Sequence, residues 1–425
     1  MFPTRKAFIL ISLLLLSHDS CGKVSDINLD DEIKQCDASE KDFQERNLFI
    51  DIEKHVFREH AVGLSFRKDI TKRDRVRGTD THEVIFAVQQ QNVDNLTRIL
   101  EDVSDPSSVR YGQYLTRQEI QDLTYNKKSH DAILGYLKDA GAFLVTKSIY
   151  GEYITARATV SLWEKLFNTE FYTFHHVRSK MESPSVIVRA ENYSVPSDLH
   201  EHVAAVFHTV QMPMAIWGKP VKRPLSTLNS TNYIRANAVT GYTSPALLNK
   251  YYKIDSNKGN SLSTQAVFET IDQYFSDSDL LLFQKQFNLP LQSLATKIGG
   301  HIDSSNNICK RDPDACTEAN MDVQYLMGIS QYSPTIHWYV DSSSFANWLL
   351  LVANNVNPPL VLSISYGAPE STVSASEFDA FNLQATKLGA MGISIVAASG
   401  GNDPFILFQQ NLWISNFLMH NNDCR

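Results

Sequence analysis

The second half of the sequence alternates short apolar segments with longer segments of helical periodicity. Apolar segments of strand length occupy Gln265–Phe268, Thr335–Val340, Leu360–Ile364 and Ile393–Ala398. Helical periodicity falls between them, near Ser278–Phe287, Glu318–Gly328, Phe345–Asn354 and Ser374–Leu388. Because such alternation is typical of a parallel sheet with helices on both faces, residues 241–403 are predicted to form a doubly wound α/β domain. Its ligands are expected at the carboxyl ends of the strands.

The first half has a different order of elements, which begins with the apolar strand Val84–Val88. A helix with apolar residues at helical spacing follows, and Thr116 and Glu119 form a capping box that opens another helix. Further elements are expected as a helix, two strands, a helix and a strand at Asp131–Ala140, Phe143–Ser148, Tyr153–Ala158, Val160–Phe167 and Glu170–Phe174. This order predicts a ferredoxin-like α+β sandwich over residues 45–211. The segment 212–240, rich in Pro, Ser, Thr and Asn, is predicted to be a linker with a dibasic processing region.

The composition indicates a globular chain with more than one core. Of 425 residues, 43% are hydrophobic and 10% are aromatic, which is enough apolar material to bury at least two cores. The formal net charge is −8, and no long basic run occurs. The charge balance therefore argues against nucleic acid as a partner.

The N-terminus has the order of a secretory signal. Arg5 and Lys6 precede the apolar run Ala7–Leu16, and small or polar residues follow as far as Gly22. The run is too short for a stable membrane anchor, and the alternative is a hydrophobic helix that belongs to the fold. We expect residues 1–22 to be a signal peptide. The remaining chain is then expected in the secretory pathway without a membrane anchor, in an extracellular or lysosomal location.

An oxidising secretory compartment bears on the interpretation of the asparagine sequons and of the cysteines. The sequons that start at Asn95, Asn192 and Asn229 become candidate glycosylation sites. Cys309 and Cys316 flank a short polar loop, and in an oxidising compartment a disulfide between them would fix the start of the following helix. Zinc is the poorer interpretation, because no second cysteine pair and no suitably spaced histidines lie nearby. No metal site is therefore expected.

Glu318 and Asp322 lie four residues apart on that predicted helix, so both carboxyls can face one cavity. Two carboxyls that close do not both ionise easily, and one keeps a raised pKa suited to proton transfer in acid. The alternative is a solvated helix face. Burial is favoured by the apolar neighbours Met321, Val323, Leu326 and Met327.

These motifs together resemble those of the sedolisins, the serine-carboxyl peptidases. The motifs are Glu318-x-x-x-Asp322-Val-Gln-Tyr-Leu, Ser363-x-Ser-Tyr-Gly367 and Ala398-Ser-Gly400. The segment Asp105–Leu115, with the sequence Asp-Pro-Ser-Ser-Val-Arg-Tyr-Gly-Gln-Tyr-Leu, is similar to the hallmark of their activation prodomain. The resemblance covers residues 45–403. It implies a subtilisin-like sheet, peptide or protein substrates, hydrolysis in acid of the tripeptidyl-peptidase kind, and a prodomain that inhibits its own chain.

The resemblance also implies roles for single residues. Glu318 would be the general base for a nucleophilic serine, and Asp322 would orient Glu318 and share its proton. Ser365, Tyr366 and Gly367 would form the strand edge that pairs with substrate, the alternative being a core strand that ends in a turn. The family places an oxyanion-stabilising aspartic acid directly after Ser-Gly. Here that position is Gly401, so Asp403 could serve only if its loop is shifted.

From Pro404 to Arg425 the sequence departs from the family pattern. The Ser-Gly-Thr-Ser turn that carries the family's nucleophile does not occur, nor does its aspartate-containing calcium site. We therefore expect a partial peptidase domain, a divergent tail at 404–425, no cofactor in this chain, and calcium only in a complete family member. Two interpretations stay open: a peptidase zymogen with an incomplete sequence, and a non-catalytic isoform that binds peptides or proteases. A subtilisin with the usual aspartate and histidine is disfavoured, because no His-Gly-Thr-His segment occurs.

Overall fold

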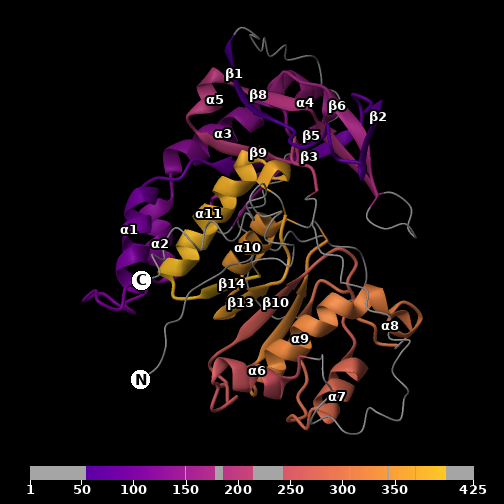
Figure 1. Ribbon diagram of the computed structural model, residues 1–425. Helices are drawn as coiled ribbons and strands as arrows, with labels where there is room; N and C mark the ends of the chain where they lie inside the picture. The colour runs from indigo at the N-terminus through magenta and orange to yellow at the C-terminus, as the bar shows by residue number, and fades with distance from the viewer. Residues whose placement is uncertain are drawn as a thin grey trace, which may run out of the picture.

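The computed structural model describes residues 54–148, 150–177, 185–213, 243–305, 307–341, 344–368 and 370–398. They form an N-terminal module, residues 54–213, and a C-terminal module, residues 243–398 (Figure 1). The expected signal peptide, the sequon at Asn229, Gly401, Asp403 and the tail lie outside the described residues, as does most of the linker.

The N-terminal module contains three antiparallel sheets. The largest has the strand order β4(Leu144–Lys147), β5(Tyr153–Thr159), β3(Thr81–Val88), β9(Val203–Phe207). The smaller sheets are formed by β2(Ile70–Arg75), β6(Phe171–His176) and β7(Ser185–Ala190), and by β1(His55–His60) with β8(Asn192–Pro196). The helices are α1(Val93–Ser104), α2(Arg117–Thr124), α3(Lys127–Ala140), α4(Val160–Phe167) and α5(Ser197–His200). A core of buried aromatic and aliphatic residues, including Phe86, Trp163 and Phe167, joins the large sheet to α3 and α4.

The fourth strand of the largest sheet differs from the sequence prediction. The strand expected at Glu170–Phe174 is present as β6, but it pairs with β2 and β7. The position beside β3 belongs to β9, where Ile85 is opposite Phe207. The physical reason is that both segments have strand patterns, and which one pairs with β3 depends on contacts between residues more than a hundred positions apart.

The C-terminal module is a mixed α/β structure built on a five-stranded parallel sheet. The strand order is β11(Thr296–Ile298), β12(Thr335–Tyr339), β10(Gln265–Glu269), β13(Val361–Ile364), β14(Ser394–Ala397). Its helical elements are α6(Pro245–Tyr252), α7(Asp277–Gln286), α8(Ile308–Arg311), η4(Pro313–Cys316), α9(Thr317–Ile329), α10(Phe345–Ala353), η5(Glu370–Thr372) and α11(Ala375–Ala390). The parallel sheet confirms the coarse prediction. Strand β11 was not anticipated, because it is short and its residues Thr296 and Lys297 are exposed.

Alternation along the central strand β10 sends side chains to two helical layers. Val267 packs on one face with residues of α7 and α9, whereas Ala266 and Phe268 pack on the other with residues of α10 and α11. Figure 1 shows α9 and α11 on different sides of the strands. The sheet is thus covered on both faces.

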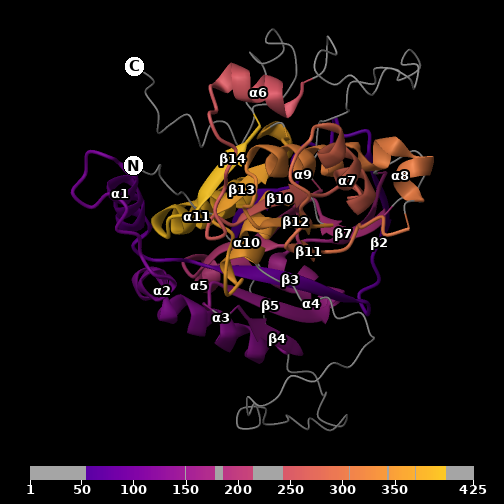
Figure 2. The same ribbon diagram turned by 90° about the horizontal axis from the view of Figure 1, so that it is seen from below.

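The two modules meet along α10 and α11. One face of the large antiparallel sheet, with Ile85, Ala87 and Tyr153, is buried together with Leu350 of α10. Leu96 of α1 and Ile120 of α2 pack against the end of α11. Figure 2 shows α10 and α11 between β13 of the C-terminal module and β3 of the N-terminal module.

Candidate active site

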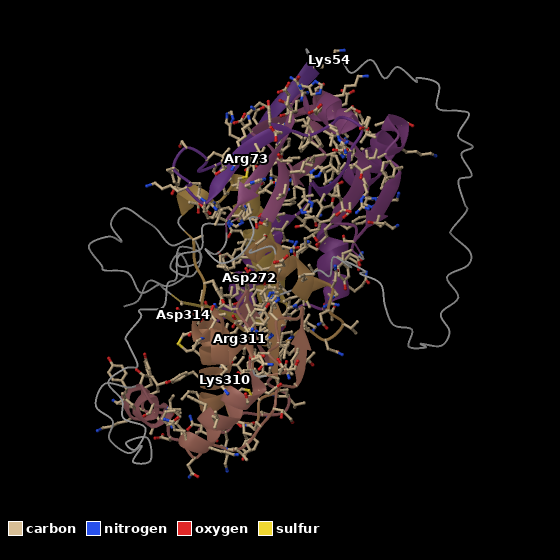
Figure 3. The ribbon with its side chains drawn as sticks, turned by 90° about the vertical axis from the view of Figure 1, so that its right-hand side faces the viewer. Lys54, Arg73, Asp272, Lys310, Arg311 and Asp314 are labelled. Atoms are coloured by element: carbon tan, nitrogen blue, oxygen red, sulfur yellow. A yellow bond between two sulfur atoms is a disulfide. The ribbon has the colours of Figure 1, made fainter. Side chains whose placement is uncertain are left out.

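The first turn of α9 is held by the loops around it. Cys309 and Cys316 form a disulfide with a Cα–Cα distance of 5.4 Å, so the bridge expected from the sequence is present directly before the helix. The side chain of Gln273 accepts a hydrogen bond from the backbone N–H of Glu318 at 3.0 Å and donates to the carbonyl of Asp314 at 3.1 Å. Asp272 and Asp314 mark these two segments in Figure 3. The position of Glu318 is therefore tied to the loop that follows β10.

The rest of α9 is fixed by its buried face. Ala319, Val323 and Met327 pack against Val267 of β10 and neighbouring aromatic and aliphatic side chains. Asn320 accepts from the backbone N–H of Ser276 at 2.9 Å. One part of the sequence interpretation is wrong: Met321 is 42% exposed, because it lies on the solvent side of the helix.

Asp322 is almost completely buried and Glu318 is half-buried, and the two carboxyls interact. Burial is the main cause that raises the pKa of Asp322 to about 7, and the neighbouring charge of Glu318 adds to it. Burial also raises the pKa of Glu318. The structure therefore brings together the two carboxyls that the sequence singles out.

A third carboxyl group, Glu269, was missed by the sequence analysis. It is the last residue of β10 and is fully buried, and its side chain accepts a hydrogen bond from Tyr366 Oη at 2.7 Å. Burial raises its pKa well above the usual range, and the charge of Asp322 raises it further. The available signal was a glutamate directly after an apolar strand of a predicted parallel sheet, at the edge where ligands bind.

Glu269 and Asp322 are close enough to share a proton. Among the described residues, Glu269 Oε1 and Asp322 Oδ2 are buried without a conventional donor. A proton shared between the two carboxyls would keep one of the two groups neutral. The chain of groups from Tyr366 through Glu269 and Asp322 to Glu318 can therefore store and move a proton between a buried site and a half-buried one.

Residues Ser365, Tyr366 and Gly367 follow β13, next to β10 in the sheet. The hydroxyl of Ser365 hydrogen-bonds to Asp322 and lowers its pKa against the effect of burial. Tyr366 is buried and bonded to Glu269, so its hydroxyl is directed into the carboxyl cluster. Two of the three residues that the sequence assigns to a strand edge therefore also contact the carboxyls.

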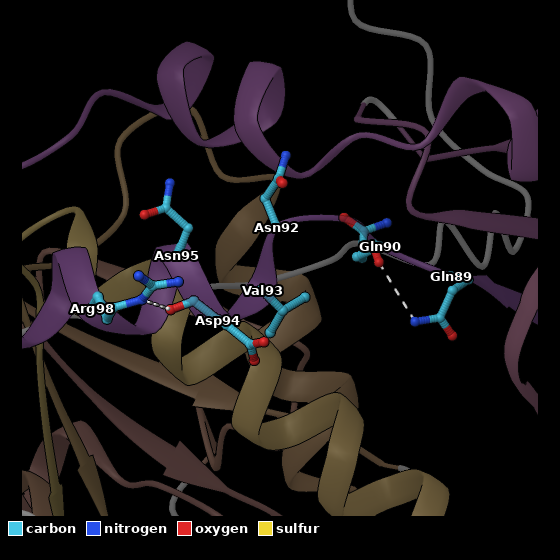
Figure 4. Close-up of a pocket in the computed structure, with 7 residues that line it drawn as sticks. All are labelled: Gln89, Gln90, Asn92, Val93, Asp94, Asn95 and Arg98. Atoms are coloured by element: carbon cyan, nitrogen blue, oxygen red, sulfur yellow. Dashed lines mark hydrogen bonds between the residues drawn. The ribbon is translucent and has the colours of Figure 1, made fainter.

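The other predicted sites lie elsewhere. Asn192, on β8, is exposed, and so is Asn95, on α1. Asn95 lines a cavity of about 440 Å³ in the N-terminal module, together with Gln89, Gln90, Asn92, Val93, Asp94 and Arg98 (Figure 4). Within the described part of the chain, no group of three or more His, Cys, Asp or Glu side chains is placed to hold a metal ion. Nor does that part contain a helix both long and apolar enough to cross a bilayer.

Comparisons with known proteins give one family match and several relatives. A family model described as the pro-kumamolisin activation domain matches residues 68–212. Tripeptidyl-peptidase 1 from Dictyostelium discoideum is 27% identical over 383 residues, which cover 81% of this chain and 61% of that protein. Human tripeptidyl-peptidase 1 is 28% identical over 331 residues, covering 74% and 55%. Physarolisin from Physarum polycephalum is 29% identical over 346 residues, covering 76% and 55%.

The chain spans between 55% and 61% of the length of these relatives. Their matches extend over both modules, because each covers about three quarters or more of this chain. The activation-domain match accounts for most of the N-terminal module. Together these matches support membership of the sedolisin family, the serine-carboxyl peptidases.

Proposed function

We propose that this chain is a zymogen form of a serine-carboxyl peptidase that hydrolyses peptide bonds in acid, similar in activity to the tripeptidyl-peptidases among its relatives. The observation that carries the proposal is the buried cluster of Glu269, Asp322 and Glu318 at the carboxyl ends of a parallel sheet. The match to an activation domain in the same chain supports the zymogen assignment. In this proposal the C-terminal module is a subtilisin-like sheet and the N-terminal module is a ferredoxin-like prodomain. The chain acts in the secretory pathway.

The residues have distinct roles in the proposed reaction. Glu318 is the half-buried carboxyl and acts as general base: it accepts the proton of a serine hydroxyl as that oxygen attacks the peptide carbonyl. Asp322 orients Glu318 and shares its proton, and Glu269 holds Asp322 in turn. Burial raises all three pKa values, so the cluster keeps protons available under acidic conditions. The strand edge at Ser365–Gly367 aligns the substrate backbone.

The nucleophile is the part of the proposal that these 425 residues do not supply. They contain no Gly-Thr-Ser segment, and without a serine beside Glu318 the covalent step cannot occur. We therefore propose that the chain as written does not turn over peptides. An oxyanion donor at Asp403 and a calcium ion in a longer family member belong to the same part of the proposal.

A chimera tests the enzymatic role directly. The C-terminal part of the D. discoideum relative is joined after β14, and hydrolysis of short peptides with free or blocked N-termini is measured at about pH 4, near the usual carboxyl pKa. The chimera is expected to cleave peptides, and Glu318→Gln is expected to lower kcat by a factor of about 100 or more. A preference for free N-termini would identify tripeptide release.

Met321→Gln is the matched control, because Met321 lies on the exposed side of the same helix and should leave kcat within about twofold. Equal activity of the chimera and its Glu318→Gln variant would contradict the assignment of the base. Turnover by the 425-residue chain alone that is lost with Glu318→Gln would instead reveal a different nucleophile, and Ser365, bonded to Asp322, would be tested first. A stable but silent chain that captures peptides would favour the non-catalytic alternative.

A further inference from the structure

Helix α9, which carries the carboxyl pair, begins without a side-chain cap of its own. Its N-cap residue is Cys316, which is bonded to Cys309 and accepts no hydrogen bond from the first turn. The first N–H groups of a helix have no partner within the helix. The N–H of Glu318 is satisfied from outside, because it donates to Gln273 Oε1 at 3.0 Å. The first turn of α9 thus takes its cap from a residue 45 positions earlier in the chain.

The side-chain amide of Gln273 uses both of its ends. Its oxygen accepts from Glu318, and its nitrogen donates to the carbonyl of Asp314 in η4 at 3.1 Å. The backbone beside it follows the same course, since the N–H of Tyr274 donates to the carbonyl of Ala315 at 2.8 Å. A planar amide that is bonded at both ends fixes its partners in distance and orientation. These three hydrogen bonds therefore align the loop after β10 with the start of α9.

The loop after β10 reaches this position through a strained turn. The N–H of Gln273 donates to the carbonyl of Thr270 at 3.3 Å, and the two central residues, Ile271 and Asp272, have φ values of 52° and 55°. Positive φ at both central positions defines a type I′ turn, in which Gly, Asn and Asp dominate. A β-branched residue rarely adopts this conformation, which persists only where the surrounding structure enforces it.

Contacts with the end of β12 enforce the turn. Thr270 Oγ1 donates to the carbonyl of Val340 at 2.7 Å, and the N–H of Asp272 donates to Tyr339 Oη at 3.1 Å. The side chain of Ile271 packs against the core between the sheet and the helices α10 and α11. The strained turn is therefore held on several sides, and it presents Gln273 to α9 in one position.

We propose that Gln273 is a positioning residue for the general base, and that the strained turn at Ile271 and Asp272 serves to present its amide to α9. Gln273 acts through the backbone of Glu318 and not on the reacting atoms. The proposal rests on the proposed function, in which Glu318 is the base, and it adds a residue outside the carboxyl cluster to the machinery of that site.

The place of Glu318 in the helix makes such a residue necessary. Asp322 lies one turn deeper and is almost completely buried, whereas Glu318 is half-buried in the first turn, where helices fray. A general base must lie within hydrogen-bonding reach of the proton that it accepts. A displacement of about 1 Å can cost a factor of about 100 in rate. A cap that holds the first turn therefore limits the loss of correctly placed base.

The titration of Glu318 in the 425-residue chain tests the proposal without any catalytic readout. Glutamate labelled with ¹³C at the side-chain carboxyl is followed by NMR as the pH is varied, and the signal of Glu318 is assigned by its loss in Glu318→Gln. Burial raises the pKa of Glu318. Gln273→Met has a similar length and no amide, so the first turn should open and the pKa of Glu318 should fall toward the ordinary value.

Hydrogen exchange resolved to single amides gives a second readout in the same chain. The N–H of Glu318 is expected to exchange about 5- to 10-fold faster in Gln273→Met, as on loss of a helix cap. Gln273→Glu keeps an oxygen that accepts from this N–H and loses the donor to Asp314. It should therefore restore the protection of Glu318 to within about twofold of the wild-type value at neutral pH.

Gln284→Met is the matched control. The amide of Gln284, on α7 of the same module, also uses both ends: it donates to the carbonyl of Gln292 at 2.9 Å and accepts from its N–H at 3.1 Å. Loss of these two bonds should lower the stability of the module and leave the titration and the exchange of Glu318 unchanged.

The chimera described above supplies the catalytic arm. In it Gln273→Met is expected to lower kcat about 10-fold while KM stays within about twofold, because positioning of the base matters for the chemical step. Gln273→Glu should lose less, and Gln284→Met should keep kcat within about twofold.

The proposal is overturned if Gln273→Met changes neither the titration nor the exchange of Glu318, or if Gln284→Met changes them equally. It is also overturned by an active chimera whose kcat is unaffected by Gln273→Met, since the contact would then serve stability alone. An inactive chimera counts against the proposed function. In that case the titration and the exchange of the 425-residue chain still decide whether Gln273 positions Glu318.

Discussion

At the residue scale, Glu269 combines complete burial with two polar partners, Tyr366 and Asp322. Truncation at this position leaves the Tyr366 hydroxyl buried without its carboxylate partner and leaves Asp322 with Ser365 alone, and each unsatisfied buried group costs about 1–3 kcal/mol. We expect Glu269→Ala to lower the free energy of unfolding by about 3 kcal/mol, whereas Glu269→Gln keeps a donor and an acceptor and should cost less than half as much. Urea denaturation at neutral pH measures the free energy of unfolding of both variants. An equal decrease in the two variants would argue against the shared hydrogen bond.

Asp322 gives the site an unusual dependence of stability on pH. Its pKa is about 7 in the folded chain against an ordinary value of 3.8, so the unfolded chain loses this proton first as the pH rises. The raised pKa of Asp322 therefore adds to the free energy of unfolding below about pH 4. This contribution, on the order of 4 kcal/mol, is lost between about pH 4 and pH 7. Asp322→Asn is expected to flatten this part of the curve of unfolding free energy against pH. An unchanged slope would show that Asp322 is already ionised in the folded chain.

At the scale of elements, helices and strands were predicted best where periodicity is local. The parallel strands at Gln265, Thr335, Val361 and Ser394 begin within one residue of the expected positions, because a buried strand must be apolar along its length. The capping box of α2 was also readable, since Thr116 and Glu119 satisfy each other's backbone groups within four residues. The pairing of strands could not be predicted from the sequence. The place beside β3 is occupied by β9 and not by β6, because of contacts between residues far apart in the chain.

The same distinction applies to the candidate site. Glu318 and Asp322 were found because a helix places both on one face within one turn. Glu269 was not found, because only the packing of β10 between β12 and β13 brings it to that helix, about 50 residues further along the chain. Proximity of that kind is a property of the sheet, and a single sequence shows at most that a glutamate ends an apolar strand.

The disulfide element before α9 is expected to stabilise the chain through its short loop. Cys309 and Cys316 are separated by seven positions, and closing a loop of this size in the unfolded chain corresponds to about 2–3 kcal/mol. We predict that replacing both cysteines by alanine lowers the free energy of unfolding by this amount and increases hydrogen exchange in the first turn of α9. The wild-type chain in reductant should behave like the double variant. If reduction changes neither quantity, the loop is held by Asp303, which accepts from the N–H groups of Asn307 and Cys309.

At the scale of the whole molecule, the two modules respond to acid with opposite signs. In the N-terminal module burial lowers the pKa of His82 to about 4 and of His208 to about 3. Because the unfolded chain binds protons below about pH 6.5, stability from these groups is present above that pH and is lost as the pH falls toward 3–4. The carboxyl cluster of the C-terminal module gains stability over much of the same range, although His337, with its pKa lowered to about 4, offsets part of this gain.

We therefore predict that the N-terminal module is the first to unfold on acidification. His208→Asn removes one titrating group at a left-handed position, φ 65°, that asparagine tolerates. It should shift the acid midpoint of the module, followed by hydrogen exchange of α3 and β5, to lower pH by about half a unit or more. His60→Asn, at an exposed position, is the control and should leave the midpoint in place. A midpoint that moves equally in both variants would exclude burial as the cause.

The end of α11 also limits how this chain can be recombined with its relatives. At Gly392, φ is 85° and an added Cβ would lie 2.4 Å from the ring of Tyr114, so neither the backbone nor the space permits another side chain. Tyr114 lies nearly 280 positions upstream, within residues 68–212, which match the activation-domain family model. A chimera that takes the two modules from different parents must therefore inherit the Tyr114 loop and the end of α11 as a pair, and natural variation at either place is expected to be correlated.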